Sequence, residues 1–472
     1  MNADQILRLV AESGIEQVRI AWCDVHGELR AKSILLRALP AALSDGIGMV
    51  GTQALKDTSD RTAFKVFEPD GLAHLPMLAE FAQASNFTVK PNLESYKQLP
   101  WAANTAWLQG QMLGADSQPL AIDSRGILQK ALDRLKQQGY GLRCGLEIEF
   151  HIYKIENARP QTDPELAAWP GLPPAVSMIH PGYRLLSERW LDRADEPLQI
   201  VRRTCAALGL PLTSLEVEFG PSQVEAVFEV QDALAAADSM VLFRSVACQA
   251  LQRAGYHATF MCRPPFPNIM SSGWHLHQSL VDLKTGSNAF AQSNPVRAEP
   301  VEAPSVLSAT GQHWLAGLLV HAQAICALAN PTLDAYERFR PNALAPTRAN
   351  WGIDSRSAML RVISADSATR IENRIGSPLA NPYLYIASQI HAGLDGITSR
   401  LQPPKADDAN AAALPANLSE ALASLQADEA LSQGFGDQVL AWFAQIKSQE
   451  ISRHDAAVDK GDWIRREYFS RL

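Results

Sequence analysis

The stretch LRCGLEIEFHIY, residues 142–153, decides the fold because its apolar and polar residues alternate. Its apolar side chains share one parity, whereas Glu147, Glu149 and His151 share the other. Successive side chains of a β-strand point to opposite faces, so this pattern is typical of a strand with one face on a core. The sequence therefore predicts that the two glutamates lie side by side on the other face.

Three further segments repeat this pattern, and they carry acidic, histidine and arginine residues on the non-core parity. They are SLEVEFGPSQVEAVF at 214–228, with Glu216, Glu218 and Glu225; WHLHQSL at 274–280, with His275, His277 and Ser279; and RIENRI at 370–375, with Arg370, Glu372 and Arg374. Each segment alone is typical of an amphipathic strand whose polar face meets water. The four together predict strands lining one cleft, and carboxylates gathered there repel one another unless cations neutralise them. Glutamate with one or two histidines suits Mg²⁺ or Mn²⁺ better than structural zinc.

Length and composition limit the class of protein. The chain has 472 residues, a net charge of −8 and the apolar and charged fractions of an ordinary globular protein. The negative charge argues against a nucleic-acid surface, and no membrane span or secretory signal is expected. Six scattered cysteines without a CxxC pair indicate reduced core residues, so we expect a cytoplasmic protein.

The order of expected elements predicts an α+β protein with two domains. A helix at about 3–13 and a hairpin over 18–34, turning at His26-Gly27, belong to a small unit over residues 1–105. A helix that Asp123 or Ser124 can cap opens the larger unit, 106–472, and a long helix covers 232–254. Helices alternating with the four site strands favour a mostly antiparallel sheet whose polar concave face carries the site.

Arginines crowd the region from 338 to 374, around Glu372. The planar guanidinium suits bidentate capture of carboxylate or phosphate, although a solvated basic surface is the alternative, which we favour for Arg340 and Arg348. For Arg370 and Arg374 the strand pattern favours a site. Glutamates, histidines and arginines in one cleft indicate metal-bound nucleotide chemistry, and the chain has neither a Walker A motif nor GxGxxG after a strand.

These segments resemble the glutamine synthetase superfamily over most of the chain. GLEIEF at 145–150 and EFGPSQVE at 218–225 are similar to its metal-ligand strands, and DVHGELRAKSI at 24–34 resembles its amino-terminal domain. SSGWHLHQS at 271–279, NPTLDAYERFRP at 330–341 and RIENRIGSPLANPYLYIAS at 370–388 match further signatures. The resemblance implies a small β-grasp-like domain followed by a catalytic domain with a curved antiparallel sheet flanked by helices.

The resemblance also implies roles for individual residues, with two or three Mg²⁺ or Mn²⁺ ions per site and ATP as co-substrate. One metal would be held by Glu149, Glu218 and Glu225, and the other by Glu147, His275 and Glu372. ATP would contact His277, Ser279, Arg361 and Arg370. L-Glutamate and the transferred phosphate would be bound by Glu149, Ser271, Gly273 and the three catalytic arginines Arg338, Arg356 and Arg374. In the family's reaction ATP phosphorylates the γ-carboxylate of glutamate, and an amine attacks the acyl phosphate to form an amide.

Departures from the family pattern bear on the acceptor. Leu344 stands where ammonia-using members carry a glutamate, and Trp274 stands where a smaller apolar residue is usual. The family's aspartate-serine latch has no clear match in VGTQALKDTSD, 50–60. A carboxylate attracts NH₄⁺ and helps to deprotonate it, so its loss predicts an organic amine with an apolar or aromatic body, placed between Leu344 and Trp274.

The chain therefore looks like the γ-glutamyl-amide ligases of the γ-glutamylanilide or γ-glutamylpolyamine type, with an aniline-like acceptor first and a polyamine or alkylamine next. Ammonia-dependent glutamine synthesis and a non-catalytic structural or sensory protein are the alternatives. The resemblance also implies a homo-oligomer, commonly a dodecamer of two stacked hexamers.

Overall fold

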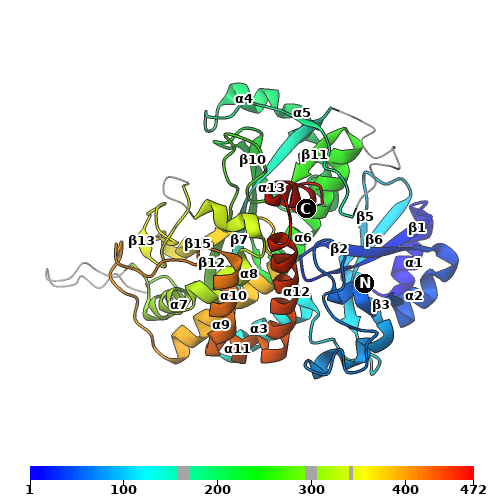
Figure 1. The fold of residues 1–472 in the computed structure, drawn as a ribbon, viewed down its shortest axis with the longest axis horizontal. Coiled ribbons are helices and arrows are strands. Elements are labelled where there is room, and N and C mark those ends of the chain that lie inside the picture. Colours follow the sequence, from blue (N-terminus) through cyan, green and yellow to red (C-terminus); the bar gives the residue numbers. More distant parts are fainter. Residues whose placement is uncertain (157–168, 293–305, 340–343, 472) are drawn as a thin grey trace.

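A computed structural model describes residues 1–156, 169–292, 306–339 and 344–471, and within these ranges the strands form two sheets (Figure 1). The smaller sheet and its helices occupy the blue, amino-terminal side of Figure 1. The larger sheet lies beside it, with helices around it. This arrangement confirms the expected α+β class.

The smaller sheet has the strand order β2-β1-β6-β4-β3, with β5 paired to β6. The expected hairpin is formed by β1 and β2, whose last pair is Cys23 opposite Leu29, and β1 also runs parallel to β6. The elements of this part are α1 (Ala3–Glu12), β1 (Gln17–Cys23), β2 (Leu29–Leu35), α2 (Leu39–Asp45), β3 (Ile47–Val50), β4 (Asn86–Pro91), β5 (Lys97–Gln98) and β6 (Thr105–Leu113).

The predicted boundary at residue 105 divides this smaller sheet, because β6 begins at Thr105 and pairs with β1, β4 and β5. The sheet therefore ends at Leu113, and the first helix of the larger unit, α3 (Ser124–Gln137), follows. The sequence misplaced this division because a buried strand looks the same whichever sheet it joins. The division into two folding domains stays a prediction.

The larger sheet has the order β13-β14-β15-β12-β7-β10-β9, with β8 and β11 paired to β7. Its pairs are antiparallel except that of β13 with β14, which agrees with the expected curved, mostly antiparallel sheet. The strands are β7 (Tyr140–Ile155), β8 (Val176–Met178), β9 (Leu212–Val217), β10 (Gln223–Asp232), β11 (Tyr256–Thr259), β12 (Trp274–Asp282), β13 (Trp351–Ile353), β14 (Leu360–Ile363) and β15 (Arg370–Gly376).

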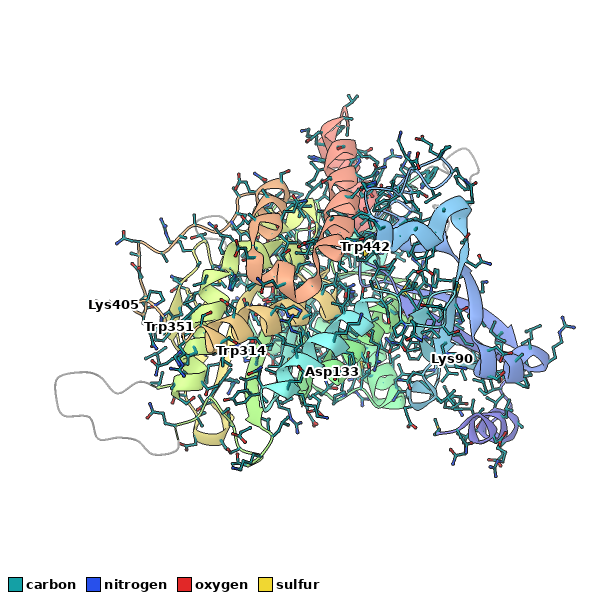
Figure 2. The ribbon with its side chains drawn as sticks, turned by 90° about the horizontal axis from the view of Figure 1, so that it is seen from below. Lys90, Asp133, Trp314, Trp351, Lys405 and Trp442 are labelled. Atoms are coloured by element: carbon teal, nitrogen blue, oxygen red, sulfur yellow. The ribbon has the colours of Figure 1, made fainter. Side chains whose placement is uncertain are left out.

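Helices cover the apolar face of this sheet, and Figure 2 looks onto part of this helical layer. Trp314 of α7 and Trp442 of α12 are both buried in it, and the indole of Trp442 donates to the carbonyl of Ala54 in the smaller unit at 3.1 Å (Figure 2). The helices of the larger unit, apart from α3, are α4 (Glu188–Arg193), α5 (Asp195–Leu208), α6 (Ala233–Arg253), α7 (Ala309–Val320), α8 (Ala322–Ala329), α9 (Pro382–Thr398), α10 (Leu418–Ala427), α11 (Glu429–Phe435), α12 (Asp437–Asp455) and α13 (Lys460–Ile464).

One helix corrects the expectation that no stretch approaches a membrane span. By length and composition α6 could cross a membrane, with a mean hydropathy of 1.3 over its most apolar window. That window is 67% buried inside the protein, and α6 packs against α5, α9 and β11. These are the properties of a core helix, whose apolar surface is covered by neighbouring elements.

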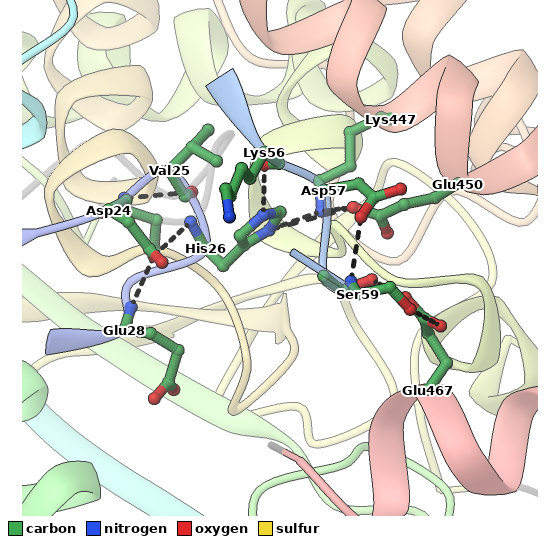
Figure 3. A network of polar contacts seen from close by, with 12 residues as sticks. Asp24, Val25, His26, Glu28, Lys56, Asp57, Ser59, Lys447, Glu450 and Glu467 are labelled. Atoms are coloured by element: carbon green, nitrogen blue, oxygen red, sulfur yellow. Dashed lines mark hydrogen bonds and ion pairs between the residues drawn. The ribbon is translucent and has the colours of Figure 1, made fainter. Parts of the chain in front are cut away.

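A buried ionic network joins the loops of the smaller unit to the carboxyl-terminal helices (Figure 3). Arg453 of α12 binds Asp57 at 2.8 Å and Glu467 at 3.1 Å, and Lys447 binds Glu450 at 3.0 Å. Glu467 lies in a π-helical turn, Arg465–Phe469, and also accepts hydrogen bonds from the hydroxyls of Thr58 and Ser59. We call these five charged residues the junction cluster: Asp57, Lys447, Glu450, Arg453 and Glu467.

Candidate active site

Strand register brings the predicted site residues together on one face of the larger sheet. Glu225 of β10 lies opposite Glu149 of β7, and Glu147 of β7 lies opposite His275 of β12. On the other side of β12, His277 lies opposite Glu372 of β15. Four strands that are distant in sequence therefore contribute to one row of acidic and imidazole side chains, as the parity of each segment predicts.

Distances within this row are short. His277 Nε2 lies 2.9 Å from Glu147 Oε1, and His275 Nδ1 lies 3.4 Å from Glu147 Oε2. His275 is also 3.8 Å from Glu149 through Nε2 and 3.8 Å from Glu372 through Nδ1. We call the residues of this row, together with Glu218 just beyond β9, the carboxylate cleft: Glu147, Glu149, Glu218, Glu225, His275, His277 and Glu372.

Two groups within the carboxylate cleft have ligand atoms within 4.8 Å of one another, close enough to share an ion. One consists of Glu147, Glu225 and His275, and the other of Glu147, His277 and Glu372. Oxygen and imidazole donors in such numbers fit a hard divalent cation. These groups divide the ligands differently from the predicted triads: Glu147 belongs to both, since β7 pairs with β10 on one side and with β12 on the other, and His277 joins the second.

Burial and mutual repulsion change the proton affinity of these carboxyls. Burial, strengthened by the charges of Glu149 and Glu147, raises the pKa of Glu225 to about 9. Burial and the charge of Glu218 raise the pKa of Glu149 to about 7. For Glu147, burial is outweighed by contacts with His275 and His277, which hold its pKa well below the usual value. Part of the cleft therefore favours protons or other cations strongly.

Arginines meet the cleft from the β15 side. Arg361 Nη1 lies 3.0 Å from one oxygen of Glu372, and Arg374 Nη1 binds the other oxygen. Arg338 instead donates to the backbone carbonyls of residues 374, 375 and 376, at 3.1, 2.9 and 2.8 Å. Arg356 is exposed in the turn after β13. Of the three predicted catalytic arginines, Arg374 is the one in direct contact with the cleft.

A cavity of about 1140 Å³ opens beside the carboxylate cleft. Three of the four residues predicted to contact ATP, namely His277, Ser279 and Arg370, line it, together with Glu147. Arg370 Nε donates to His277 Nδ1 at 3.2 Å, so the imidazole and guanidinium are held together. Arg361 is not among the lining residues and faces Glu372 and Asp354 instead. The size of the cavity suits a nucleotide-sized ligand.

The turn before β12, predicted to bind glutamate, reaches the cleft through its backbone. The amide of Gly273 donates to Glu149 Oε2 at 2.8 Å. A Cβ at Gly273 would lie 2.4 Å from Nη2 of Arg338, so no other residue fits here without moving that arginine. Ser271 accepts a hydrogen bond from Arg263 at 3.0 Å through its hydroxyl.

Gln223 is a site residue that the sequence analysis missed. Its side chain donates to Glu149 at 3.1 Å and is 2% exposed. The signal was present, because Gln223 and Glu225 share the same parity in strand β10. An amide carries no charge, however, and an isolated glutamine in a strand does not stand out from ordinary polar residues.

The structure corrects the predicted acceptor pocket. Trp274 is fully buried and packs edge-on against Tyr385, with ring centroids 5.1 Å apart, so its side chain lies on the core face and not in the cleft. The physical reason is parity, since neighbouring residues of a strand point to opposite faces and His275 occupies the cleft side. Leu344 is 70% exposed at a left-handed φ of 58°, and residues 340–343 before it lie outside the described ranges.

Comparisons with known proteins show which family and which solved structures this chain resembles. The family model described as "Glutamine synthetase, catalytic domain" matches residues 121–468 of this chain. A γ-glutamylanilide synthase of Acinetobacter sp is 36% identical over 490 aligned positions, which cover 100% of this chain and 96% of that protein. A γ-glutamylethanolamide synthetase of Streptomyces coelicolor is 29% identical with the same coverage. The solved structure of GmaS with ADP superposes with a TM-score of 0.77 at 26% identity and covers 98% of each chain.

Proposed function

Because the chain belongs to the glutamine synthetase family and is an ATP-dependent glutamate–amine ligase, we propose that its acceptor is an organic amine with an apolar or aromatic body. The γ-phosphoryl group of ATP passes to the γ-carboxylate of L-glutamate, which gives an acyl phosphate and ADP. The amine nitrogen then attacks the acyl carbon, phosphate leaves, and the nitrogen loses a proton. The products are a γ-glutamylamide, ADP and phosphate.

The observation that carries the ligase assignment is the carboxylate cleft beside the 1140 Å³ cavity. We propose that Mg²⁺ or Mn²⁺ ions, two or three per site, are held by the six predicted ligands, with His277 available to them. Bound there, such ions neutralise charge on the transferred phosphoryl group. In this proposal the cavity holds the nucleotide against His277, Ser279 and Arg370.

The protein's own cations complement that site. Arg374 is 10% exposed in its side chain and points along the cleft face of β15, next to Glu372. We propose that its guanidinium contacts the transferred phosphate, because a planar donor pair in a water-poor site stabilises spreading negative charge. Arg338 and Gly273 shape the neighbouring turn, in which glutamate would be bound.

The acceptor proposal rests on Leu344. Ammonium is charged at neutral pH and must lose a proton before it attacks, so it benefits from a carboxylate, which Leu344 cannot supply. An arylamine is already neutral and gains about 2 kcal/mol by burying its ring. The relation to a γ-glutamylanilide synthase supports the same class of acceptor. Trp274 gives no support, since it lies in the core.

The test is phosphate release with glutamate, ATP and a panel of amines: aniline, a short alkylamine, putrescine and ammonium. We expect aniline to have the highest kcat/KM and ammonium the lowest. Leu344→Glu should shift preference toward ammonium and putrescine, whereas Val320→Glu, at another exposed apolar residue, should not. Ammonium as the best acceptor would identify an ordinary glutamine synthetase. A wide preference for putrescine would overturn the apolar acceptor but leave the ligase assignment intact.

We also propose that the ligase is a cytoplasmic homo-oligomer of two stacked hexamers. All six cysteines are unpaired, which suits a reducing compartment. Leu35, Leu36 and Val50 of the smaller unit are exposed apolar residues that a neighbouring subunit would cover. Light scattering after size-exclusion chromatography measures the subunit number directly, and a monomer at micromolar concentration would refute the assembly.

A further inference from the structure

We propose that Gln223 is a positioning residue that orients the Glu149 carboxylate toward the cleft and at the same time holds the turn 271–273. The proposal deepens the proposed function, on which its kinetic part rests. One uncharged side chain would thus connect the metal ligands to the segment that is expected to bind glutamate.

The hydrogen bonds of Gln223 reach three separate parts of the site. Nε2 lies 3.1 Å from each of three acceptors: Glu149 Oε2, the Ser271 carbonyl and Ser272 Oγ. Oε1 accepts from the amide of Gly220 at 2.9 Å, in the turn that follows Glu218. A buried amide with both ends occupied has one low-energy orientation, because reversing it would place donors against donors.

The orientation of Glu149 follows from these contacts. Its Oε2 receives hydrogens from Gln223 at 3.1 Å and from the Gly273 amide at 2.8 Å. Oε1 is then the oxygen that faces the cleft, 3.8 Å from His275 Nε2. Hydrogen bonds to one carboxylate oxygen in this way fix the rotation of the group and present the other oxygen to a cation.

A second layer extends the network into the core. Ser272 Oγ lies 3.1 Å from Gln223 Nε2, from which it can accept a hydrogen, and 3.2 Å from His151 Nδ1. His151 and Ser272 are both fully buried, and His151 lies opposite Gln223 in the register of β7 and β10. His151, Ser272 and Gln223 therefore form one buried chain of polar contacts, and Gln223 connects this chain to Glu149.

Other side chains would not perform this role. A carboxylate at position 223 would face Glu149 with a second negative charge and could not donate to it. An apolar side chain would leave the Gly220 amide and the Ser271 carbonyl without their present partner. The turn 271–273 cannot move toward Arg338, since Gly273 already lies against that guanidinium. Loss of the Gln223 amide should therefore disturb Glu149 and the turn together.

The experiment compares Gln223→Met with Gln278→Met in the full-length protein. Gln278 is a matched control because it is 1% exposed and hydrogen-bonded at both ends, to Gln389 at 3.1 Å and Trp314 at 2.9 Å, away from the cleft. Four quantities are measured: Mn²⁺ affinity by electron paramagnetic resonance of free Mn²⁺, ADP affinity by calorimetry, KM for glutamate, and Tm. The Mn²⁺ titration needs neither acceptor nor turnover.

For Gln223→Met we expect Mn²⁺ affinity to fall by about 10- to 100-fold, with KM for glutamate rising as well and ADP affinity little changed. Gln278→Met should lower Tm comparably without changing Mn²⁺ affinity. Equal Mn²⁺ affinity in wild type and Gln223→Met, or equal losses in both variants, would overturn the proposal. If no amine supports turnover but Mn²⁺ binding still depends on Gln223, the proposed function fails and the positioning role stands.

Discussion

The carboxylate cleft and the junction cluster both bury acidic side chains, but they balance charge in different ways. In the junction cluster three acids meet Lys447 and Arg453, and burial raises the pKa of Glu450 to about 7 despite Lys447. In the cleft, Arg361 and Arg374 both bind Glu372. Within the described ranges Glu149, Glu218 and Glu225 have no lysine or arginine at ion-pairing distance.

This difference separates a structural cluster from a functional one. A buried ion pair whose hydrogen bonds are satisfied holds its elements together without any ligand. Carboxylates that face one another without fixed cations are costly in the ligand-free protein, and the cost is removed when divalent ions bind. The comparison predicts that changes in the cleft affect turnover and cation binding, whereas changes in the junction cluster affect folding.

The largest effect is expected from removing a cleft carboxylate. Glu147→Ala, Glu149→Ala and Glu372→Ala should each lower kcat/KM about 1000-fold or more, equivalent to about 4 kcal/mol of transition-state stabilisation. Phosphate release measures this loss, and Glu229→Ala, at an exposed glutamate of the neighbouring strand β10, serves as control. Near-normal turnover in any of the three, or in EDTA, contradicts the cation-dependent cleft.

Removing a positively charged side chain from the junction cluster should instead lower the free energy of unfolding. Arg453→Met leaves Asp57 and Glu467 buried without their main partner, at a cost of about 3 to 5 kcal/mol in free energy of unfolding. Arg466→Met removes a partly exposed pair with Asp462 and should cost less than about 1 kcal/mol. Chemical denaturation compares the two; equal stability would show that the junction cluster is not a structural clamp.

Divalent cations should stabilise the cleft and not the junction cluster. Mn²⁺ at 100 times its Kd should add about 2.7 kcal/mol to the free energy of unfolding, and the gain should be the same in Arg453→Met. Glu225→Gln should lose a large part of it, because Glu225 belongs to one of the two cation groups. Thermal unfolding with and without Mn²⁺ provides the measurement, and an undiminished gain in Glu225→Gln would exclude this residue as a ligand.

The last effect is a pH dependence in EDTA, and it is small for each pH unit. The folded pKa of Glu225 is raised to about 9, so between about pH 4.5 and 9 the folded state binds a proton that the unfolded state has lost. The contribution of Glu225 to the free energy of unfolding is therefore greatest below pH 4.5. It falls as the pH rises toward 9, by at most about 1.4 kcal/mol per pH unit. Glu225→Gln cannot titrate, so its stability relative to wild type should rise over that window. A constant difference in Tm from pH 5 to 9 would refute the shift.

Local patterns predicted much of the fold and most of the cleft. Alternation in 142–153 identified which side of β7 carries Glu147 and Glu149, and the same rule held for β12 and β15. The hairpin of β1 and β2 and the helices α1, α3 and α6 also followed from turn residues and periodicity. Predictions failed where they depended on contacts between distant parts of the chain. The pairing of β6 with the smaller sheet was not predicted, and Gln223 and Trp274 were misjudged because their neighbours come from other elements.

The sequence alone determined the chemistry available to this protein, since the parity of a strand is a property of the backbone and needs no tertiary contact. It also determined the family, through several motifs that occur together. Only the tertiary structure decided which ligands form a group, because strand register sets which side chains stand opposite one another. It likewise decided that Asp57 is bound within its own chain by Arg453, a contact between residues 396 positions apart that no local pattern can specify.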